Sequence, residues 1–413
     1  MIDESHTVSE IACKVSDELR EKLVVLGVSA SSALYRALDL ARQLIRRCAD
    51  VHVVMTKSAT ELVAPKLFEW ATGNPVVTEI SGRVEHIALA RRASAVIIAP
   101  ATLRRLTALA YGLEGDLMTL LAIAARSMGK LVALVPAMHV DLWRSRQCRE
   151  AVDRLEEMGY VVIPPYIVGG RLVFPEPRVL ARVLAALILR GRDMRGLRIV
   201  VSAGATREFI DDVRFISNPS SGRMGLEIAL EAWARGAHVV LVAGHLEVEP
   251  PPWIPTVRCT STEDMLRAML RAVKEVKPHA VVMAAAPADF KPSRRLSGKI
   301  DSHAERISLS LVPTPKILRE LRKVFDGVLV GFAAEAVESV EAGRERALRK
   351  LEEYGLDMIV LNPVSKPGVG FASEFNEVLM LLKDGEEVFV PRARKEVVAR
   401  AVVDKVLKLV EQS

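Results

Sequence analysis

Aromatic residues make up only 5% of this 413-residue chain, so its core must be built from aliphatic side chains. Aliphatic cores suit parallel sheets whose strands are buried on both faces. No apolar run reaches the roughly 18 residues that a membrane-spanning helix needs. The N-terminus is polar and acidic, without the pattern of a secretory signal. We therefore expect a globular protein in the cytoplasm, with no membrane partner.

Cysteine is also scarce. The four cysteines are far apart in the sequence, and no two of them form a CxxC pair: Cys13, Cys48, Cys148 and Cys259. This spacing excludes a zinc knuckle or a thioredoxin-like pair. A disulfide framework is not expected in an intracellular chain of this length.

The net charge is +6, but the basic residues alternate with acidic ones and form no tail or arm. Nucleic-acid binders usually concentrate their positive charge on one face or segment. The charge pattern therefore favours small anionic ligands over nucleic acid.

Apolar runs of strand length alternate with helical periodicity along the chain, and the pattern restarts after a basic stretch at 190–196. Alternating strands and helices predict parallel sheets covered by helices on both faces. We expect two successive three-layer α/β/α (Rossmann-like) domains with mostly parallel sheets, spanning 1–190 and 191–413. The expected strands are 23–28, 51–55, 95–99, 131–135 and 160–163, then 197–203, 238–243, 279–284, 328–333 and 357–361. Segment 164–178, rich in proline and glycine, predicts a surface excursion, and Asp384–Gly385 predicts a hairpin.

Each half begins with a strand that enters a turn of small residues, Gly27–Ser32 in the first and Ser202–Thr206 in the second. We expect a helix after each turn. Such turns let backbone N–H groups approach a phosphate. Neither turn matches the dinucleotide-binding pattern GxGxxG. An ordinary tight turn therefore explains each sequence about as well as a phosphate-binding turn does.

The second half also holds a dense polar stretch at 206–225 that precedes a helix expected near Gly222. Its arginines, serines and Asn218 could clamp a phosphate or a carboxylate through charge-assisted hydrogen bonds. Residues 284–289 (AAAPAD) end a strand, where α/β sheets place ligands. Lys299 follows in a basic loop, where composition alone predicts a solvated surface lysine.

These motifs carry a family resemblance. The sequences SNPSSGRMG (217–225), AAAPADF, GFAAE (331–335) and LNPVS (361–365) resemble phosphopantothenate–cysteine ligase domains. The first half resembles flavin-containing cysteine decarboxylases through GVSAS (27–31), VEHIALARRASAVIIAPAT (84–102) and VPAMH (135–139). The order of the two halves is that of the bifunctional enzymes of coenzyme A biosynthesis, archaeal forms included.

The resemblance implies two consecutive reactions. The ligase half activates 4′-phosphopantothenate with CTP and Mg²⁺ to an acyl-cytidylate, which cysteine then attacks. The decarboxylase half, a flavodoxin-like fold, uses FMN to convert the product to 4′-phosphopantetheine. The resemblance also implies a homo-oligomer built on trimers.

In the ligase half, the resemblance assigns catalysis to Arg214, Asn218 and Lys299. Acyl activation brings two anions together, so cations and donors are needed to stabilise the transition state. Nucleotide or substrate contacts are implied for Met283, Ala284, Ala285, Asp289, Lys299, Pro315, Lys316, Ile317, Leu318, Phe332 and Lys350. No metal ligand set is visible in the sequence.

In the decarboxylase half, His86 matches the active-site base of the family, although a lone histidine is more often structural. The implied contacts to FMN are Gly27, Ser29, Ser31, Thr56, Pro100, Thr102 and Met138. His139 would bind the substrate carboxylate.

The chain departs from the family pattern at several positions. Tyr354 replaces a frequent lysine, His139 an asparagine, and Ala30 and Ser31 two glycines. The flap at 164–178 has no cysteine, and Cys148, in a helical run, is expected to be a structural thiol. Tyr166 or water would then donate the last proton.

Three other functions remain open at this point. The first half could be a degenerate scaffold that only binds flavin or forms an oligomer. The whole chain could be a nucleotide-binding regulator without chemistry. Flavin prenyltransferase activity of the first half is a weaker alternative, because related folds share FMN sites.

Overall fold

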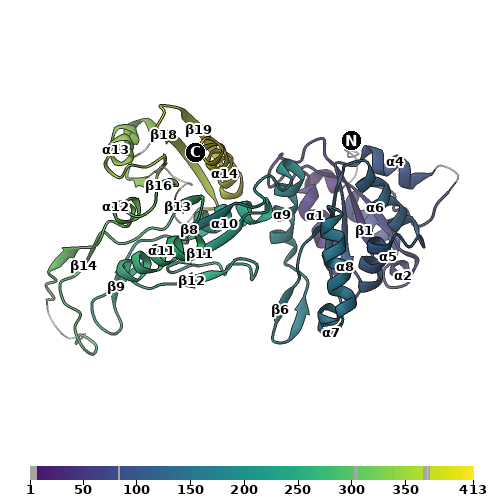
Figure 1. Ribbon diagram of the computed structural model, residues 1–413, viewed down its shortest axis with the longest axis horizontal. Coiled ribbons are helices and arrows are strands. Elements are labelled where there is room, and N and C mark those ends of the chain that lie inside the picture. Colours follow the sequence, from purple (N-terminus) through teal and green to yellow (C-terminus); the bar gives the residue numbers. More distant parts are fainter. Residues whose placement is uncertain (1–6, 82–83, 302–305, 338, 366–369, 371–372) are drawn as a thin grey trace. The chain divides into compact units, whose positions relative to one another are not determined.

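The computed structural model describes residues 7–413 except 82–83, 302–305, 338, 366–369 and 371–372. It divides between Gly191 and Arg192 into two compact units, each with its own main sheet (Figure 1). Both main sheets are wholly or mostly parallel and carry helices, so the expected fold class is confirmed.

The N-terminal unit has five parallel strands in the order β2-β1-β3-β4-β5. Every residue of β1 and β3 is buried, as aliphatic strands between two helical layers should be. This is the flavodoxin-like order, in which the switch point between β1 and β3 is the usual ligand site. The strands are Leu23–Val28 (β1), Asp50–Met55 (β2), Ala95–Ala101 (β3), Leu131–Pro136 (β4) and Val161–Val162 (β5).

Helices cover both faces of this sheet, because right-handed crossovers that leave β1 and β3 in opposite directions lie on opposite sides. On one side α1 packs against α3 and α9; on the other α4 packs against α6, and α5 against α8. The helices are η1 (Thr7–Glu10), α1 (Tyr35–Ile45), α2 (Lys57–Thr60), α3 (Pro65–Thr72), α4 (Glu85–Arg92), α5 (Leu103–Tyr111), α6 (Leu117–Ser127), α7 (Val140–Arg144), α8 (Arg146–Glu157) and α9 (Pro177–Arg190).

The segment 164–178 contains regular structure that the sequence did not predict. Strands β6 (Tyr166–Val168) and β7 (Arg171–Val173) form an antiparallel hairpin around Gly169 and Gly170, both with positive φ. Ile167 and Val168 are exposed, so the segment does lie on the surface. Strands of three residues are too short to give a recognisable alternating pattern.

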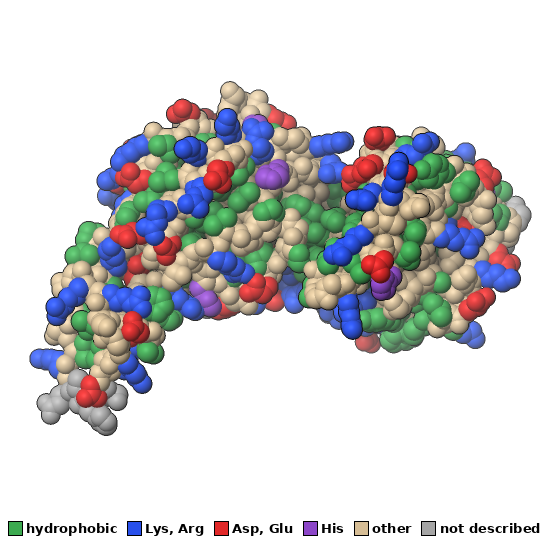
Figure 2. All heavy atoms as spheres, turned by 60° about the horizontal axis from the view of Figure 1, so that its bottom comes forward, with side chains coloured by type: hydrophobic (Ala, Val, Ile, Leu, Met, Phe, Trp, Pro, Cys, Tyr) green, Lys and Arg blue, Asp and Glu red, His purple; other side chains and the backbone are tan. Residues whose placement is uncertain are grey.

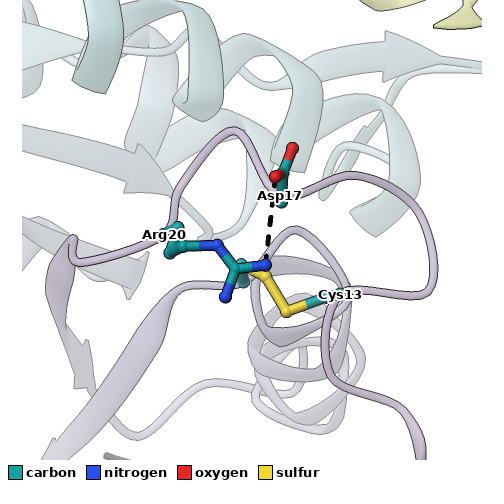
Figure 3. Close-up of a disulfide and its surroundings, with 4 residues drawn as sticks. Cys13, Asp17 and Arg20 are labelled. Atoms are coloured by element: carbon teal, nitrogen blue, oxygen red, sulfur yellow. Dashed lines mark ion pairs between the residues drawn. A yellow bond between two sulfur atoms is a disulfide. The ribbon is translucent and has the colours of Figure 1, made fainter.

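A disulfide joins Cys13 to Cys48, and this corrects the expectation of a chain without one (Figure 3). The residues are 35 apart in sequence, but α1 returns the chain so that their Cα atoms lie 4.5 Å apart. Backbone hydrogen bonds from Cys13 to Ile45 and from Val15 to Arg46 hold the two segments together. Sequence spacing cannot reveal such a pair, because the approach depends on how α1 packs.

The C-terminal unit has an eight-stranded sheet in the order β12-β11-β8-β13-β16-β17-β18-β19. All neighbouring strands are parallel up to β17, and β18 and β19 are antiparallel. The predicted hairpin at Asp384–Gly385 joins β18 to β19 and is confirmed. The strands are Arg198–Ala203 (β8), His238–Ala243 (β11), Thr256–Arg258 (β12), Ala280–Met283 (β13), Val328–Glu335 (β16), Met358–Pro363 (β17), Phe375–Leu382 (β18) and Glu387–Arg394 (β19).

Helices α10 and α14 pack together on this unit, and α11 packs against α12. A buried arginine, Arg235 at the end of α10, forms ion pairs of 2.7 Å with both Asp193 and Asp404. Because Asp404 lies on α14, its ion pair with Arg235 connects α14 to α10, whereas Asp193 connects the segment before β8 to the same arginine. The helices are Arg223–Ala234 (α10), Thr262–Val276 (α11), Ile317–Arg322 (α12), Val340–Glu353 (α13) and Lys395–Gln412 (α14).

Two small antiparallel ribbons extend from the main sheet and are called the arm here (Figure 1). They pair β9 with β10 and β14 with β15, and the arm includes the turn at 210–214 and the loop at 293–300. The ribbon strands are Arg207–Phe209 (β9), Phe215–Ser217 (β10), Phe290–Pro292 (β14) and Leu311–Pro313 (β15). The helix expected directly after the turn at 202–206 is therefore wrong, because the β9–β10 ribbon comes first and α10 begins only at Arg223.

In the described part of the chain, no helix is long and apolar enough to cross a membrane.

Candidate functional site

A cavity of about 400 Å³ lies in the C-terminal unit, beside the ends of β13, β16 and β17 and the start of α10. This is the carboxyl edge of the parallel strands, next to the switch point at β8, where open α/β sheets bind ligands. The cavity lining includes all but two of the residues predicted for this half: Asn218, Met283, Ala284, Ala285, Asp289, Pro315, Lys316, Ile317, Leu318, Phe332 and Lys350.

Three glycines bring the start of α10 against the turn after β8. Gly222 has a φ of 76°, and a Cβ there would lie 3.1 Å from the backbone of Gly204. A Cβ at Gly225 would lie 2.5 Å from the carbonyl oxygen of Ser202. The sequence SSGRMG therefore serves close packing of α10 on the strand, which leaves the helix N-terminus at the cavity wall.

A buried set of hydroxyl groups holds the 285–289 loop. Thr206 Oγ1 accepts a hydrogen bond from the backbone N–H of Ala288 over 2.9 Å, and Thr314 Oγ1 donates to the Ala288 carbonyl oxygen over 2.6 Å. Thr262 donates from both its N–H and its hydroxyl to the buried Glu208 carboxylate, each over 2.7 Å. These residues were missed by sequence reasoning, because isolated threonines in different elements give no local pattern.

Charged pairs occupy the cavity wall. Lys350 Nζ donates to Glu335 Oε1 over 2.7 Å, and Glu335 is buried. Lys316 Nζ donates to Asp289 Oδ1 over 2.5 Å. Each predicted lysine thus already has a carboxylate partner, and an incoming phosphate must compete with that carboxylate for the ammonium. Glu335 was quoted in the motif GFAAE, but its pairing with Lys350 was not predicted.

Arg214 and Lys299 do not line the cavity and lie on the arm instead. Arg214 donates to Asp211 Oδ2 over 2.9 Å and to the Ile300 carbonyl oxygen over 3.0 Å, whereas Lys299 is exposed. Hydrogen bonds from the backbone N–H groups of Arg214 and Ile300 hold the pKa of buried Asp211 well below its usual range. The structure therefore places these two residues together, but apart from the other predicted residues.

In the N-terminal unit, the predicted flavin contacts follow the ends of four neighbouring strands. Ser29 and Ser31 follow β1, Thr56 follows β2, Thr102 follows β3 and Met138 follows β4, while Gly27 and Pro100 lie within β1 and β3. The turn after β1 leads directly into the helical segment of α1, as predicted. Because parallel strands end at the same edge, these side chains gather around the switch point between β1 and β3.

The two predicted histidines differ in environment. His86 lies on α4, and its Nδ1 is buried without a hydrogen-bond partner among the described residues. His139 is exposed at the start of α7, where Nδ1 accepts from the backbone N–H of Asp141 over 3.3 Å. An unpartnered buried ring nitrogen calls for a ligand or water, whereas His139 caps a helix.

Two family models match the chain, one in each unit. The C-terminal domain of DNA/pantothenate metabolism flavoproteins matches residues 194–410, and the Flavoprotein family matches residues 12–178. The coenzyme A biosynthesis bifunctional protein CoaBC of Thermococcus kodakarensis is 35% identical over 411 residues, covering 98% of this chain and 99% of that protein. The chain belongs to the CoaBC family.

Other relatives agree. The CoaBC protein of Escherichia coli K12 is 31% identical over 407 residues, which cover 94% of this chain and 97% of that protein. A crystal structure of the C-terminal domain of a CoaBC protein is 36% identical, covers 54% of this chain and 100% of its own, and has a TM-score of 0.45. As a CoaBC protein, the chain is a bifunctional enzyme of coenzyme A biosynthesis that combines ligation with decarboxylation.

The departures from the CoaBC pattern have structural consequences. Cys148 is buried on α8, and its Sγ lies 3.9 Å from Met138 Sδ. Burial raises the pKa of Cys148 to about 11. Burial also raises the pKa of Tyr166 on β6, and the nearby Glu176 raises it further. At neutral pH both groups are therefore protonated.

Proposed function

We propose that the C-terminal unit ligates cysteine to 4′-phosphopantothenate with CTP, and that the N-terminal unit decarboxylates the product with FMN. The observation that carries the ligase assignment is the cavity whose lining includes all the predicted residues of this half except Arg214 and Lys299. It combines backbone donors at the start of α10, an apolar strand end and paired lysines. Such a mixture suits a nucleoside triphosphate lying beside a carboxylate.

In the ligation, a carboxylate oxygen of 4′-phosphopantothenate attacks the α-phosphorus of CTP, and pyrophosphate leaves with the electron pair of the broken P–O bond. The cysteine amine then displaces CMP from the acyl-cytidylate. Met283–Ala285 would contact the base, with Phe332 against it, and Asp289 with Lys316 would hold the sugar side. Asn218 shapes the wall beside the reacting carboxylate. Pro315, Ile317 and Leu318, which line the cavity at the start of α12, would exclude water from the nucleotide.

Arg214 and Lys299 require movement to take part. The arm that carries them would have to reach the cavity, from this chain or from another copy, when both substrates are bound. Apo geometry alone does not rule out a catalytic group, because such contacts often tighten only in the complex. Mg²⁺ would arrive with the triphosphate, since this ion is held mainly by phosphates and one or two protein groups.

The N-terminal unit fits FMN on two observations. Hydroxyl side chains stand at the ends of β1, β2 and β3, and His86 Nδ1 is a buried polar atom with no partner among the residues that the structure describes. Bound FMN would supply the redox chemistry, because it can accept electrons from the cysteinyl group and later return them. Ser29, Ser31 and the turn after β1 would bind its phosphate, Thr56, Pro100, Thr102 and Met138 would surround the ring, and His86 would take the thiol proton. His139 would donate to the substrate carboxylate.

The location and assembly belong to the same proposal. We place the enzyme in the cytoplasm, as a homo-oligomer built on trimers.

The test is a stepwise reconstitution of the purified chain. Incubation with 4′-phosphopantothenate, cysteine, Mg²⁺ and either CTP or ATP should yield the cysteine adduct and then its decarboxylated product by mass spectrometry, with CTP preferred. A yellow protein that ligates but releases no carbon dioxide would make the first half a scaffold. Nucleotide binding without pyrophosphate release would make the chain a regulator.

A further inference from the structure

The start of α14 brings a buried lysine into the ligase cavity. Lys395 is the first residue of α14, only 6% exposed, and it lines the cavity together with Arg223 at the start of α10. Its Nζ donates to the carbonyl oxygen of Gly370 over 2.9 Å. A buried ammonium is costly unless anions or dipoles compensate it. Because both Lys395 and Arg223 line it, this wall of the cavity suits an anionic ligand.

Charges of both signs surround this ammonium. Arg223 on α10 repels it, while Glu227 on α10 and Glu247 after β11 attract it. Glu374 forms ion pairs with Arg223, 3.6 Å, and with Arg394, 2.8 Å, and its backbone carbonyl oxygen accepts a hydrogen bond from the N–H of Lys395. Burial, followed by repulsion from Arg223, lowers the pKa of Lys395 to about 8. An anion that enters the cavity would raise this pKa and favour the charged ammonium.

Two buried amides point independently to a ligand at the same wall. Asn362 at the end of β17 is 8% exposed and Asn376 on β18 is 1% exposed, and both line the cavity. The Oδ1 atom of each is buried and has no hydrogen-bond partner in the part of the chain that the structure describes. The pairing of β18 with β19 is irregular between Asn376 and Val378, the kind of bulge that re-aims a side chain at a functional site.

Unsatisfied buried amides need partners. A side-chain amide can accept a hydrogen bond through its oxygen or donate one through its NH₂ group. A ligand with hydroxyl donors and phosphate acceptors provides a partner for each of these two groups. A nucleoside triphosphate has this chemistry.

We propose that Lys395 is a further catalytic residue of the ligase, whose ammonium binds the β- and γ-phosphates of the nucleotide and stabilises the charge on departing pyrophosphate. This inference rests on the proposed ligase function. When the carboxylate oxygen bonds to the α-phosphorus, the bond to the bridging oxygen breaks and its electron pair leaves with pyrophosphate. A cation at that oxygen is most useful in the transition state, where its charge develops.

The test measures pyrophosphate release from CTP and 4′-phosphopantothenate in the absence of cysteine. The amine of cysteine then makes no contribution to the pH dependence. Lys395→Met should lower the rate constant of this step by about 10²-fold, the usual effect of removing one such donor. Lys408→Met, on the exposed face of the same helix, is the matched control and should react like the native protein. Carbon dioxide release from supplied 4′-phosphopantothenoylcysteine should be unchanged in both variants.

A second variant protects the test against misfolding. In the native protein kcat/KM should fall as the pH rises through about 8, because Lys395 loses its charge. Lys395→Arg stays charged in this range, so it should retain activity and lose that fall. Equal pyrophosphate release by Lys395→Met and Lys408→Met, or the same fall in Lys395→Arg, overturns the proposal. A native protein that releases no pyrophosphate refutes the ligase function itself.

Discussion

The side-chain amide of Asn218 donates a hydrogen bond to the carbonyl oxygen of Ala286 over 3.2 Å, and a second to that of Pro287 over 3.0 Å. These bonds connect the segment after β10 to the loop after β13, so one side chain joins two parts of the cavity wall. Only a donor can make them, since both partners are carbonyl oxygens.

Two substitutions of Asn218 should therefore separate the loss of these hydrogen bonds from the effect of a negative charge at this position. Asn218→Ala removes both hydrogen bonds and should slow pyrophosphate release by about 10²-fold. Asn218→Asp should be slower still, because its carboxylate repels carbonyl oxygens and phosphates alike. Stopped-flow or coupled detection of pyrophosphate measures both. An Asn218→Ala variant with native kinetics would show that these bonds are dispensable.

Lys299 allows a test of the arm. It is exposed and outside the cavity, so nucleotide affinity in the absence of 4′-phosphopantothenate should be unaffected by Lys299→Ala. Formation of the acyl-cytidylate should nevertheless slow by about 10²–10³-fold, because the cation is needed only in the assembled complex. Arg294→Ala, on the same arm, is the control (Figure 2 shows the basic side chains of this arm). Equal rates for the two variants would remove Lys299 from catalysis.

The strands of the two main sheets could be predicted from the sequence, because buried parallel strands are continuous aliphatic runs. The expected 23–28 is β1, and the expected 238–243 is β11, residue for residue. Short ribbons such as β9–β10 were not predicted, because a strand of three residues is too short to show an alternating pattern with a period of two. Contacts distant in sequence, such as the hydrogen bond from Asp212 N–H to Gly298 O, also hold the arm together, and no local pattern predicts them.

The ligase cavity was predictable where motifs follow strand ends, as at Met283–Ala285 and Phe332. Lys395 was not, because it lies in an ordinary amphipathic helix well beyond the last family motif, LNPVS (361–365), and nothing in the sequence distinguishes it from the other lysines. Only the packing of α14 against α10 brings it to the cavity. Similarly, Glu335 could be quoted as part of a motif, but its pairing with Lys350 depends on how α13 lies against β16.

His86 should separate the two activities. The unpartnered Nδ1 suggests that the ring faces a ligand, so His86→Asn should retain FMN, held by the strand-end residues, and lose carbon dioxide release. Ligation by the other unit should continue, and the cysteine adduct should accumulate. His52→Asn, a histidine paired with Asp50, serves as control. Full decarboxylation by His86→Asn would assign the residue to packing.

The last proton of the decarboxylase reaction can be traced with two variants. Cys148→Ser should leave the reduced product unchanged, because this thiol is buried against Met138 and its raised pKa keeps it protonated and unreactive. Tyr166→Phe should accumulate enethiol if the phenol, kept protonated by burial and Glu176, donates the proton. Mass spectrometry distinguishes the two products. Accumulation in Cys148→Ser would contradict cysteine-independence, and accumulation in neither variant would leave water as the donor.

The Cys13–Cys48 disulfide should stabilise the N-terminal unit. It closes a loop of 35 residues, for which the chain-entropy relation gives roughly 4 kcal/mol. Cys13→Ser/Cys48→Ser should therefore lower the Tm of this unit by roughly 10 °C, while Cys148→Ser, which keeps the disulfide, isolates the effect of a lost thiol. Thiol titration after denaturation without reductant should find two free cysteines, Cys148 and Cys259. Four free thiols in the purified protein, or an unchanged Tm in the double variant, would show that the disulfide does not contribute to the stability of the fold.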